Sequence, residues 1–250
     1  MQLAHMTWIE VETRLREGVA VMVPVGSTEQ HGPMGPIGTD TICAEAVALR
    51  AADLCDAIVA PALAYTPAPF NTGFPGTVSM PEDLFQAHAA AVFRGLLAQG
   101  FAGVFIVNGH GANVAPLQRA AQELAPAKLA VRSWWEPEEV NGMRQKLYGG
   151  WEGMHATPSE IAITQALLGE LPAGEAAEPP RKLSAAFIKA HAGDRHGPPE
   201  KHRAEFPDGR VGSHSALANP EDGARLLEAA ARGICEDFQA FSVQAVGGAG

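Results

Sequence analysis

Four short, mostly apolar runs punctuate the chain. They span residues 19–25, 57–63, 103–107 and 128–133. The first run is continuously apolar, which is typical of a parallel strand that is buried on both sides. The pattern predicts the strands of a mainly parallel sheet.

Amphipathic segments separate these runs. Residues 42–49, which follow Asp40, place apolar side chains at helical spacing, and a long final segment behind Asn219 repeats the pattern. Ser79 and Glu82 have the spacing of a capping box at the start of another helix. Alternating strands and helices predict an α/β protein, a single-domain layered α/β/α fold.

Length and composition support one domain. The chain has 250 residues, of which 46% are hydrophobic and 18% charged. A chain of this length and composition can bury a full hydrophobic core, so we expect one domain over residues 1–250. Residues 172–218 are rich in proline and glycine and hold four irregularly spaced histidines. We expect a long surface excursion or lid there, and neither a separate domain nor a metal-binding tract.

The charge excludes several classes of partner. A formal net charge of -10 and a pI of about 5.3 argue against nucleic acid and anionic membranes. Three cysteines without a close-spaced pair indicate a reducing compartment and no thiolate metal cage. The sequence shows no signal peptide and no apolar run that could span a bilayer, so we expect a soluble cytoplasmic protein.

The candidate chemistry gathers where the first apolar run ends. A loop rich in glycine and proline carries Glu29, His31 and Asp40. In an extended chain Glu29 and His31 point the same way, and two carboxylates with an imidazole make a divalent-metal site. Each residue also has a simpler interpretation: Asp40 as a helix N-cap, Glu29 as a solvated acid, and His31 as a structural histidine.

Two later stretches add to this site. His110 follows the third apolar run, where open α/β sheets place their ligands, outside the carboxyl ends of the strands. His155 precedes the sequence Thr157 to Glu160, which fits a capping box, so that Glu160 has a purely structural alternative. The tryptophan pair at 134–135 is typical of core packing, although it could also wall a substrate pocket.

Taken together, these motifs resemble the creatininase (creatinine amidohydrolase) family over nearly the whole chain. The segments that carry the resemblance are residues 24–33 with 38–40, 74–79, 108–113, 155–160 and 209–212. The resemblance implies a cytoplasmic α/β hydrolase with two divalent metals (Zn, Mn or Fe), often a hexamer. Such enzymes cleave non-peptide C–N bonds of small cyclic amides or formamides, and one branch acts on a peptide.

The resemblance also implies roles for individual residues. Glu29 and His110 would hold one metal, His31 the other, and Asp40 would bridge both. His155 would be the catalytic histidine, assisted by Glu152. The substrate would meet Trp135, Trp151 and Gly111.

The chain departs from creatininase itself in the loop after His110. Gly111 and Ala112 stand where that enzyme has a tyrosine and a metal-binding glutamate, and Ala112 cannot ligate a metal. Glu160 is the candidate replacement ligand. This departure favours members other than creatininase proper, such as deformylases.

The expected mechanism uses water activated by two metals, with His155 protonating the leaving nitrogen. Creatinine hydrolysis is the nearest alternative function. Two other classes stay open: a non-catalytic protein that binds metal or a small molecule, and a metal-free scaffold.

Overall fold

A parallel sheet with strand order β2-β1-β3-β4 forms the centre of the protein. In the computed structural model, residues 1–169, 176, 178–193 and 195–247 are described. The strands are β1 (Val21–Val25), β2 (Ile58–Val59), β3 (Val104–Asn108) and β4 (Leu129–Ser133). The mainly parallel sheet expected from the apolar runs is confirmed.

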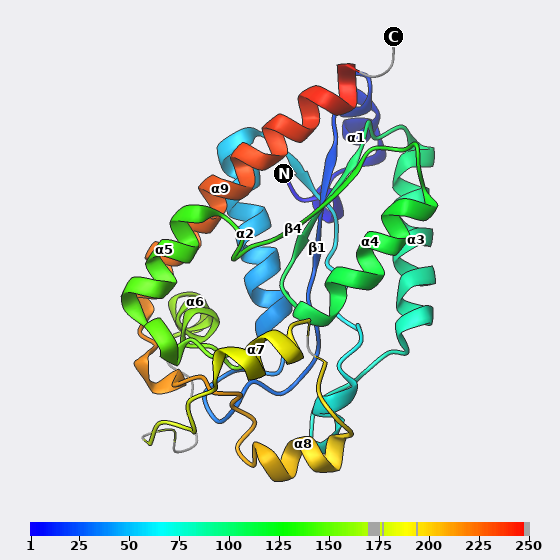
Figure 1. The fold of residues 1–250 in the computed structure, drawn as a ribbon. Coiled ribbons are helices and arrows are strands. Elements are labelled where there is room, and N and C mark those ends of the chain that lie inside the picture. The colour runs from blue at the N-terminus through cyan, green and yellow to red at the C-terminus, as the bar shows by residue number, and fades with distance from the viewer. Residues whose placement is uncertain (170–175, 177, 194, 248–250) are drawn as a thin grey trace.

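Helices cover both faces of the sheet (Figure 1). Helices α2 and α9 pack on one face, while α3 and α4 lie on the other, which gives the expected α/β layering. The helices are α1 (Trp8–Leu15), α2 (Thr39–Cys55), α3 (Glu82–Gln99), α4 (Val114–Glu123), α5 (Glu138–Leu147), α6 (Pro158–Leu168), α7 (Ala185–His191), α8 (Pro199–Glu205) and α9 (Pro220–Gly247). Short 3-10 turns are η1 (Leu3–His5), η2 (Pro69–Gly73), η3 (Gly111–Asn113), η4 (Gly149–Trp151) and η5 (Ser215–Leu217).

The central strands are apolar, apart from Asn108 at the end of β3, because each face meets a helix layer. On β1, Val21 and Val23 belong to the core beneath α3 and α4, whereas Met22 belongs to the core beneath α2 and α9. On β3, Ile106 and Phe105 divide in the same way. Full burial of each such side chain stabilises the fold by roughly 1.5–3 kcal/mol.

Two local predictions need correction. The second strand is shorter than residues 57–63, since Pro61 offers no backbone N–H to the ladder; only Leu63 makes a further bridge, to Val25. The capping box at Ser79 and Glu82 is wrong. Pro81 precedes helix α3 without a side-chain cap, and the Ser79 hydroxyl instead accepts a hydrogen bond from the Ala68 amide over 2.9 Å.

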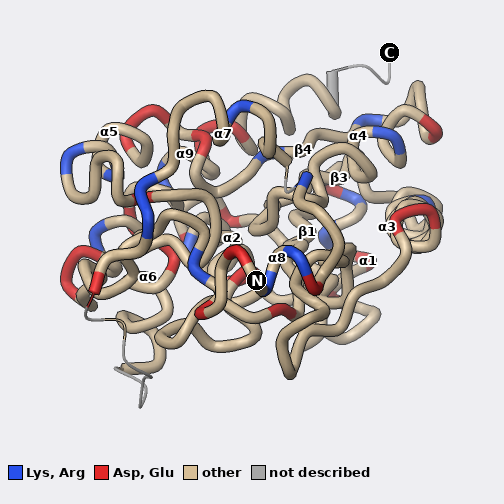
Figure 2. The backbone as a smooth tube through the Cα atoms, turned by 60° about the horizontal axis from the view of Figure 1, so that its bottom comes forward, with Lys and Arg blue, Asp and Glu red and all other residues tan. Residues whose placement is uncertain are grey.

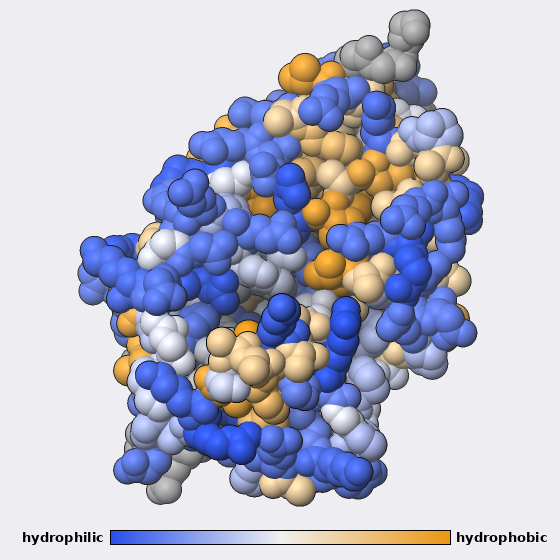
Figure 3. Space-filling model, in the orientation of Figure 1, coloured by the Kyte–Doolittle hydropathy of each residue, from blue (hydrophilic) through white to orange (hydrophobic). Residues whose placement is uncertain are grey.

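The edge strand β4 is less covered than the central strands. Leu129, Ala130 and Val131 are only half-buried, and Figure 3 shows apolar residues gathered on this face between α9 and α4. Figure 2 shows acidic and basic residues interspersed along the outer helices. No described helix is long and apolar enough to cross a bilayer.

The segment 172–218 contains α7 and α8 and then returns to the core; residues 172–175, 177 and 194 of it lie outside the described part. Val211 is buried and forms an isolated backbone bridge with His155, so the returning segment lies beside the candidate site. Farther out, the His196 and His202 rings pack on Phe70 with centroids 4.7 and 4.9 Å away. A role for the segment as a lid stays a prediction.

Candidate metal centre

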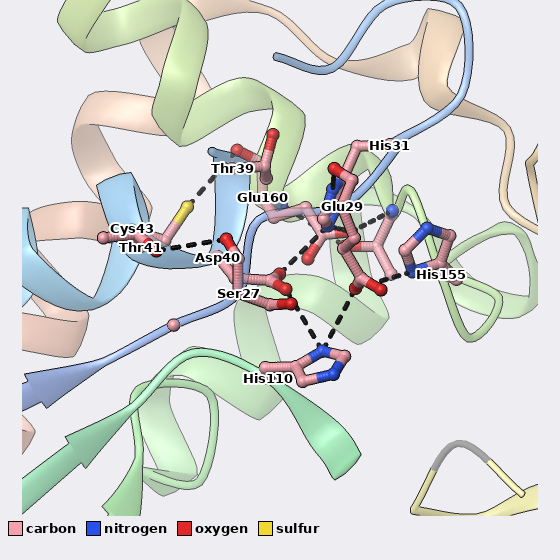
Figure 4. A network of polar contacts seen from close by, with 12 residues as sticks. Ser27, Glu29, His31, Thr39, Asp40, Thr41, Cys43, His110, His155 and Glu160 are labelled. Atoms are coloured by element: carbon pink, nitrogen blue, oxygen red, sulfur yellow. Dashed lines mark hydrogen bonds and ion pairs between the residues drawn. The ribbon is translucent and has the colours of Figure 1, made fainter. Parts of the chain in front are cut away.

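The candidate site lies at the carboxyl ends of β1 and β3. The loop after β1 carries Glu29 and His31 and leads into α2, which carries Asp40 in its first turn. The loop after β3 carries His110. Because β1 and β3 are neighbouring parallel strands, their loops leave the sheet at the same edge and bring these side chains together (Figure 4).

Asp40 does not cap helix α2. The helix begins at Thr39 and its N-cap residue is Gly38, with no side-chain cap bond. The Asp40 carboxylate is 3% exposed and faces His31 and His110 instead. The N-cap alternative is therefore wrong.

Asp40 lies between two sets of donor atoms. Its Oδ1 is 2.9 Å from His31 Nε2, which lies 3.9 Å from Glu160 Oε1. Its Oδ2 is 3.1 Å from His110 Nδ1, which is also 3.1 Å from Glu29 Oε1. The ligand atoms of each set lie within 4.8 Å of one another, one set being Glu29, Asp40 and His110 and the other His31, Asp40 and Glu160.

A backbone carbonyl holds each imidazole of the site. His31 Nδ1 is 3.1 Å from the Glu29 carbonyl, and His110 Nε2 is 2.8 Å from the Pro67 carbonyl. Donation to these oxygens fixes the tautomer and leaves the other ring nitrogen facing the carboxylates. This is the arrangement that histidine ligands of metals adopt.

Glu160 combines a structural contact with a place in the site. Its Oε1 accepts a hydrogen bond from the Thr157 amide over 2.5 Å, and the predicted capping box of α6 is complete. The same side chain is 8% exposed and belongs to the donor set with His31 and Asp40. The two interpretations of Glu160 are compatible.

Burial and opposite charges control the protonation of the cluster. Burial alone would lower the pKa of His31, but Asp40 raises it to about 10. Burial alone would raise the pKa of Asp40, yet His31 and His110 hold it well below its usual range. Burial raises the pKa of Glu160 to about 7 against the opposing effect of His31. Without metal, protons on the histidines therefore compensate the buried carboxylates.

The donor set fits divalent metal ions. Glu29 Oε1 and Asp40 Oδ2 are buried, and both lie 3.1 Å from the same atom, His110 Nδ1, without a well-directed hydrogen bond in the described structure. Two buried carboxylate oxygens on one imidazole nitrogen are costly unless a cation satisfies them. Mixed carboxylate and imidazole donors suit zinc, manganese and iron.

His155 packs directly against this cluster. Its ring centroid is 4.5 Å from that of His31, and its Nδ1 is 3.6 Å from Glu29 Oε1. Its Nε2 donates to the Gln30 carbonyl over 2.6 Å. Burial lowers the pKa of His155 to about 3, so the ring is neutral. Glu29, His31 and His155 also form a third group with metal-ligand spacing.

Of the three residues predicted to meet the substrate, two line a pocket beside the cluster and one does not. Trp135 and Gly111 line a pocket of about 180 Å³ together with Asp40, His110 and His155. Trp151 lies outside that lining. Its ring faces His214 and the Lys182 ammonium, with Nζ 4.5 Å from the ring centroid.

Glu152 contacts the pocket wall through another residue. Its Oε1 accepts a hydrogen bond from Arg144 Nε over 2.8 Å and another from the Ser159 hydroxyl. Arg144 lines the pocket. Assistance of His155 by Glu152 stays a prediction.

Sequence reasoning missed two buried amides. Asn71 Nδ2 donates to Glu29 Oε2 over 2.8 Å, and Asn71 Oδ1 accepts from Gln30 Nε2 over 2.7 Å. Gln30 stands between Glu29 and His31 in the motif, and this position could have identified it as a residue of the site. Asn71 lies in the 3-10 turn η2, where no spacing connects it to the site.

Known proteins resemble this chain over most of its length. The family model Creatininase, described as creatinine amidohydrolase, matches residues 4–238. A creatinine amidohydrolase from Pseudomonas putida is 30% identical over 188 residues, which cover 68% of this chain and 72% of that protein.

Two shorter matches name other activities. A mycofactocin precursor peptide peptidase from Mycolicibacterium smegmatis is 42% identical over 106 residues, or 40% of this chain and 42% of that protein. A 3-dehydro-scyllo-inosose hydrolase from Thermotoga maritima is 35% identical over 107 residues, or 42% of this chain and 34% of that protein. Both matches span less than half of the relative's length.

Among solved structures, a crystal structure of creatininase superposes with a TM-score of 0.75 at 24% identity, over 96% of this chain and 97% of that chain. This likeness confirms the fold. With the family match across most of the chain, it follows that the protein belongs to the creatininase family of hydrolases.

Proposed function

We propose that this chain is a metal-dependent amidohydrolase that cleaves a non-peptide C–N bond in an amide, either a small cyclic amide or a formamide. We further propose two divalent ions per chain, zinc, manganese or iron. One observation carries the proposal: Asp40 stands between two donor sets, with Glu29 and His110 on one side and His31 and Glu160 on the other. A shared carboxylate between two such sets is the arrangement of a binuclear centre.

The residues around the centre support a division of roles. When bound, divalent ions supply Lewis acidity and a water that is nucleophilic near neutral pH. His155 holds its Nδ1 toward the centre and its Nε2–H on the Gln30 carbonyl, so that Nδ1 accepts a proton and later gives it to the leaving nitrogen. Trp135 and Gly111 border the place where the amide lies.

Creatinine hydrolysis is the second candidate. The relative from Pseudomonas putida, a creatinine amidohydrolase, favours it. Gly111 and Ala112 argue against it, because the bulky and acidic side chains of creatininase at these positions are missing here. A non-catalytic metal-binding protein of the same fold is the third candidate.

We also propose that the protein acts in the cytoplasm on a small molecule, as a homo-oligomer and, by family resemblance, a hexamer. The half-buried apolar residues of edge strand β4 support an assembly of copies. Light scattering of the purified protein tests the oligomer directly.

Metal content and turnover test the proposed function together. Protein purified without chelators should contain about two divalent ions per chain by elemental mass spectrometry and should hydrolyse members of a panel of cyclic amides and formamides. Asp40→Asn should lose both properties. Asp53→Asn, an exposed position on the same helix, is the matched control and should keep both.

The other outcomes separate the candidates. Creatine formed from creatinine at the highest rate in the panel would favour creatininase proper. Firmly bound metal and tight binding of amides without turnover would favour the non-catalytic protein. Protein that is folded, metal-free and refractory to metal loading would refute the hydrolase.

A further inference from the structure

The pocket over the metal centre is small. Its volume is about 180 Å³, and its lining includes Asp40, His110, His155 and Trp135. A water molecule occupies about 30 Å³ in the liquid, so the pocket holds a reacting group of only a few heavy atoms. A formamide group or a small ring fits within it.

A much larger groove continues from this pocket. Its volume is about 1000 Å³, and it shares Gly111 and Gly193 with the metal pocket. We call it the tail groove. Its walls include Pro67, Pro69, Pro81, Ala112, Ala115 and Pro199.

The tail groove begins at a metal-ligand candidate. The Pro67 carbonyl, which belongs to a wall residue, lies 2.8 Å from His110 Nε2. Ala112 and Ala115 also line the groove, and Gly111, which has no side chain, lines both the groove and the metal pocket. The groove is thus continuous with the place where the C–N bond would lie.

The lining favours an apolar occupant. Proline, alanine and glycine dominate it, and its two charged residues have opposite signs: Glu82, which is paired with Arg119, and Arg195. Most of the lining is therefore uncharged. It selects by shape and by apolar area.

We propose that the tail groove binds an extended, largely apolar substituent of the amide whose reacting end occupies the metal pocket. The substrate class is therefore an amide with a small head and a long apolar tail. This inference rests on the proposed function, because the head must lie at the metal centre. A ring of the size of creatinine would leave the groove unused.

A series of alkyl hydroxamates tests the groove without turnover. Hydroxamates chelate divalent metals, so acetohydroxamate probes the metal pocket of zinc-loaded protein, and its butano-, hexano- and octano- homologues extend into the groove. Calorimetry should show affinity rising about three- to fourfold for each methylene group that becomes buried.

A blocking variant localises the tail. Ala115→Trp places a large ring in the tail groove from an exposed position of α4. It should remove the dependence on chain length while leaving acetohydroxamate affinity and zinc content unchanged. Ala87→Trp, exposed on α3 and outside the groove lining, should keep the full dependence.

The results distinguish the groove from the metal centre. Acetohydroxamate that binds with an affinity equal to that of octanohydroxamate would overturn the groove proposal and leave the metal centre standing. A length dependence that survives Ala115→Trp would overturn it too. Zinc-loaded protein that binds no hydroxamate at all would overturn both proposals.

Discussion

The Asn71 amide donates a hydrogen bond to Glu29 over 2.8 Å, and neither side chain has any exposed surface. The same Nδ2 lies 3.3 Å from His155 Nε2, and Asn71 Oδ1 accepts a hydrogen bond from Gln30. One buried amide therefore orients a metal-ligand candidate and contacts the proposed acid–base histidine.

Removal of this amide should weaken metal binding. Asn71→Ala leaves Glu29 without its orienting donor, and loss of such an outer partner lowers metal affinity by about 10- to 100-fold. Competition with a chromophoric chelator measures the change. Asn141→Ala, at an exposed position on α5, should leave the affinity unaltered. Equal affinity in both variants would show that Asn71 only fills space.

Substitution of Glu160 should separate its two roles. Glu160→Gln keeps an oxygen for the Thr157 amide but loses the charge, so the metal content should fall from about two ions per chain to about one with little change in stability. Thr157→Ala should do the reverse. It removes the cap, lowers the free energy of unfolding by about 1 kcal/mol and keeps both ions. Two ions in Glu160→Gln would leave Glu160 as a cap alone.

Loss of His155 should abolish turnover without loss of metal. His155→Ala removes the proton acceptor beside Glu29, and we expect turnover to fall by about 10²- to 10⁴-fold. The measurement is the rate on the best amide of the panel, together with metal content. His88→Ala, on the exposed face of α3, is the control. If an ion is lost with the ring, His155 is a ligand.

The histidines packed on Phe70 should make folding sensitive to acid. Burial lowers the pKa of His196 from 6.5 to about 4, aided by His202 and His191 and opposed by Glu205. Between these two values the unfolded chain binds the extra proton, so the free energy of unfolding falls as the pH decreases from about 6.5 toward 4.

Comparison with a ring that cannot titrate measures this contribution. His196→Phe should lose less stability than the wild type when denaturant unfolding is repeated at about pH 7 and about pH 5. His88→Phe, at an exposed position, should follow the wild type. Equal losses in His196→Phe and the wild type would mean that His196 already titrates normally in the folded state.

Gly109 is fixed by close contact with the helix that carries Asp40. A Cβ atom at Gly109 would lie 2.2 Å from the Asp40 carbonyl oxygen. Gly109→Ala should therefore lower the free energy of unfolding by about 1–3 kcal/mol and weaken metal binding. Gly95→Ala, where an added Cβ would meet nothing within 4 Å, should be neutral or stabilising. Denaturant unfolding of both variants checks the difference.

The centre of the sheet could be predicted because β1 and β3 are buried on both faces. Double burial leaves apolar runs in the sequence, residues 19–25 for β1 and residues 104–107 for β3. Glu29, His31, Asp40 and His110 could be predicted as a group because strand ends in a parallel sheet meet at one edge. These arguments use only local pattern and general topology.

Other features depend on contacts that no local pattern records. Ser79 has the spacing of a cap, but its hydroxyl bonds to the Ala68 amide in a loop that passes nearby. Asn71 reaches Glu29 across a separation of 42 residues. Trp151 contacts His214 and Lys182, which both belong to the segment 172–218. The sequence pattern did not predict where this segment lies in the fold.

The adjacency of β1 and β3 has an evolutionary consequence. Two hydrogen-bonded strands deliver Glu29, His31 and His110, whereas Ala112 and Ala115 of the groove wall contribute no donor atom. Members of the family can therefore keep the proposed metal centre and differ in substrate through the exchange of a few wall residues.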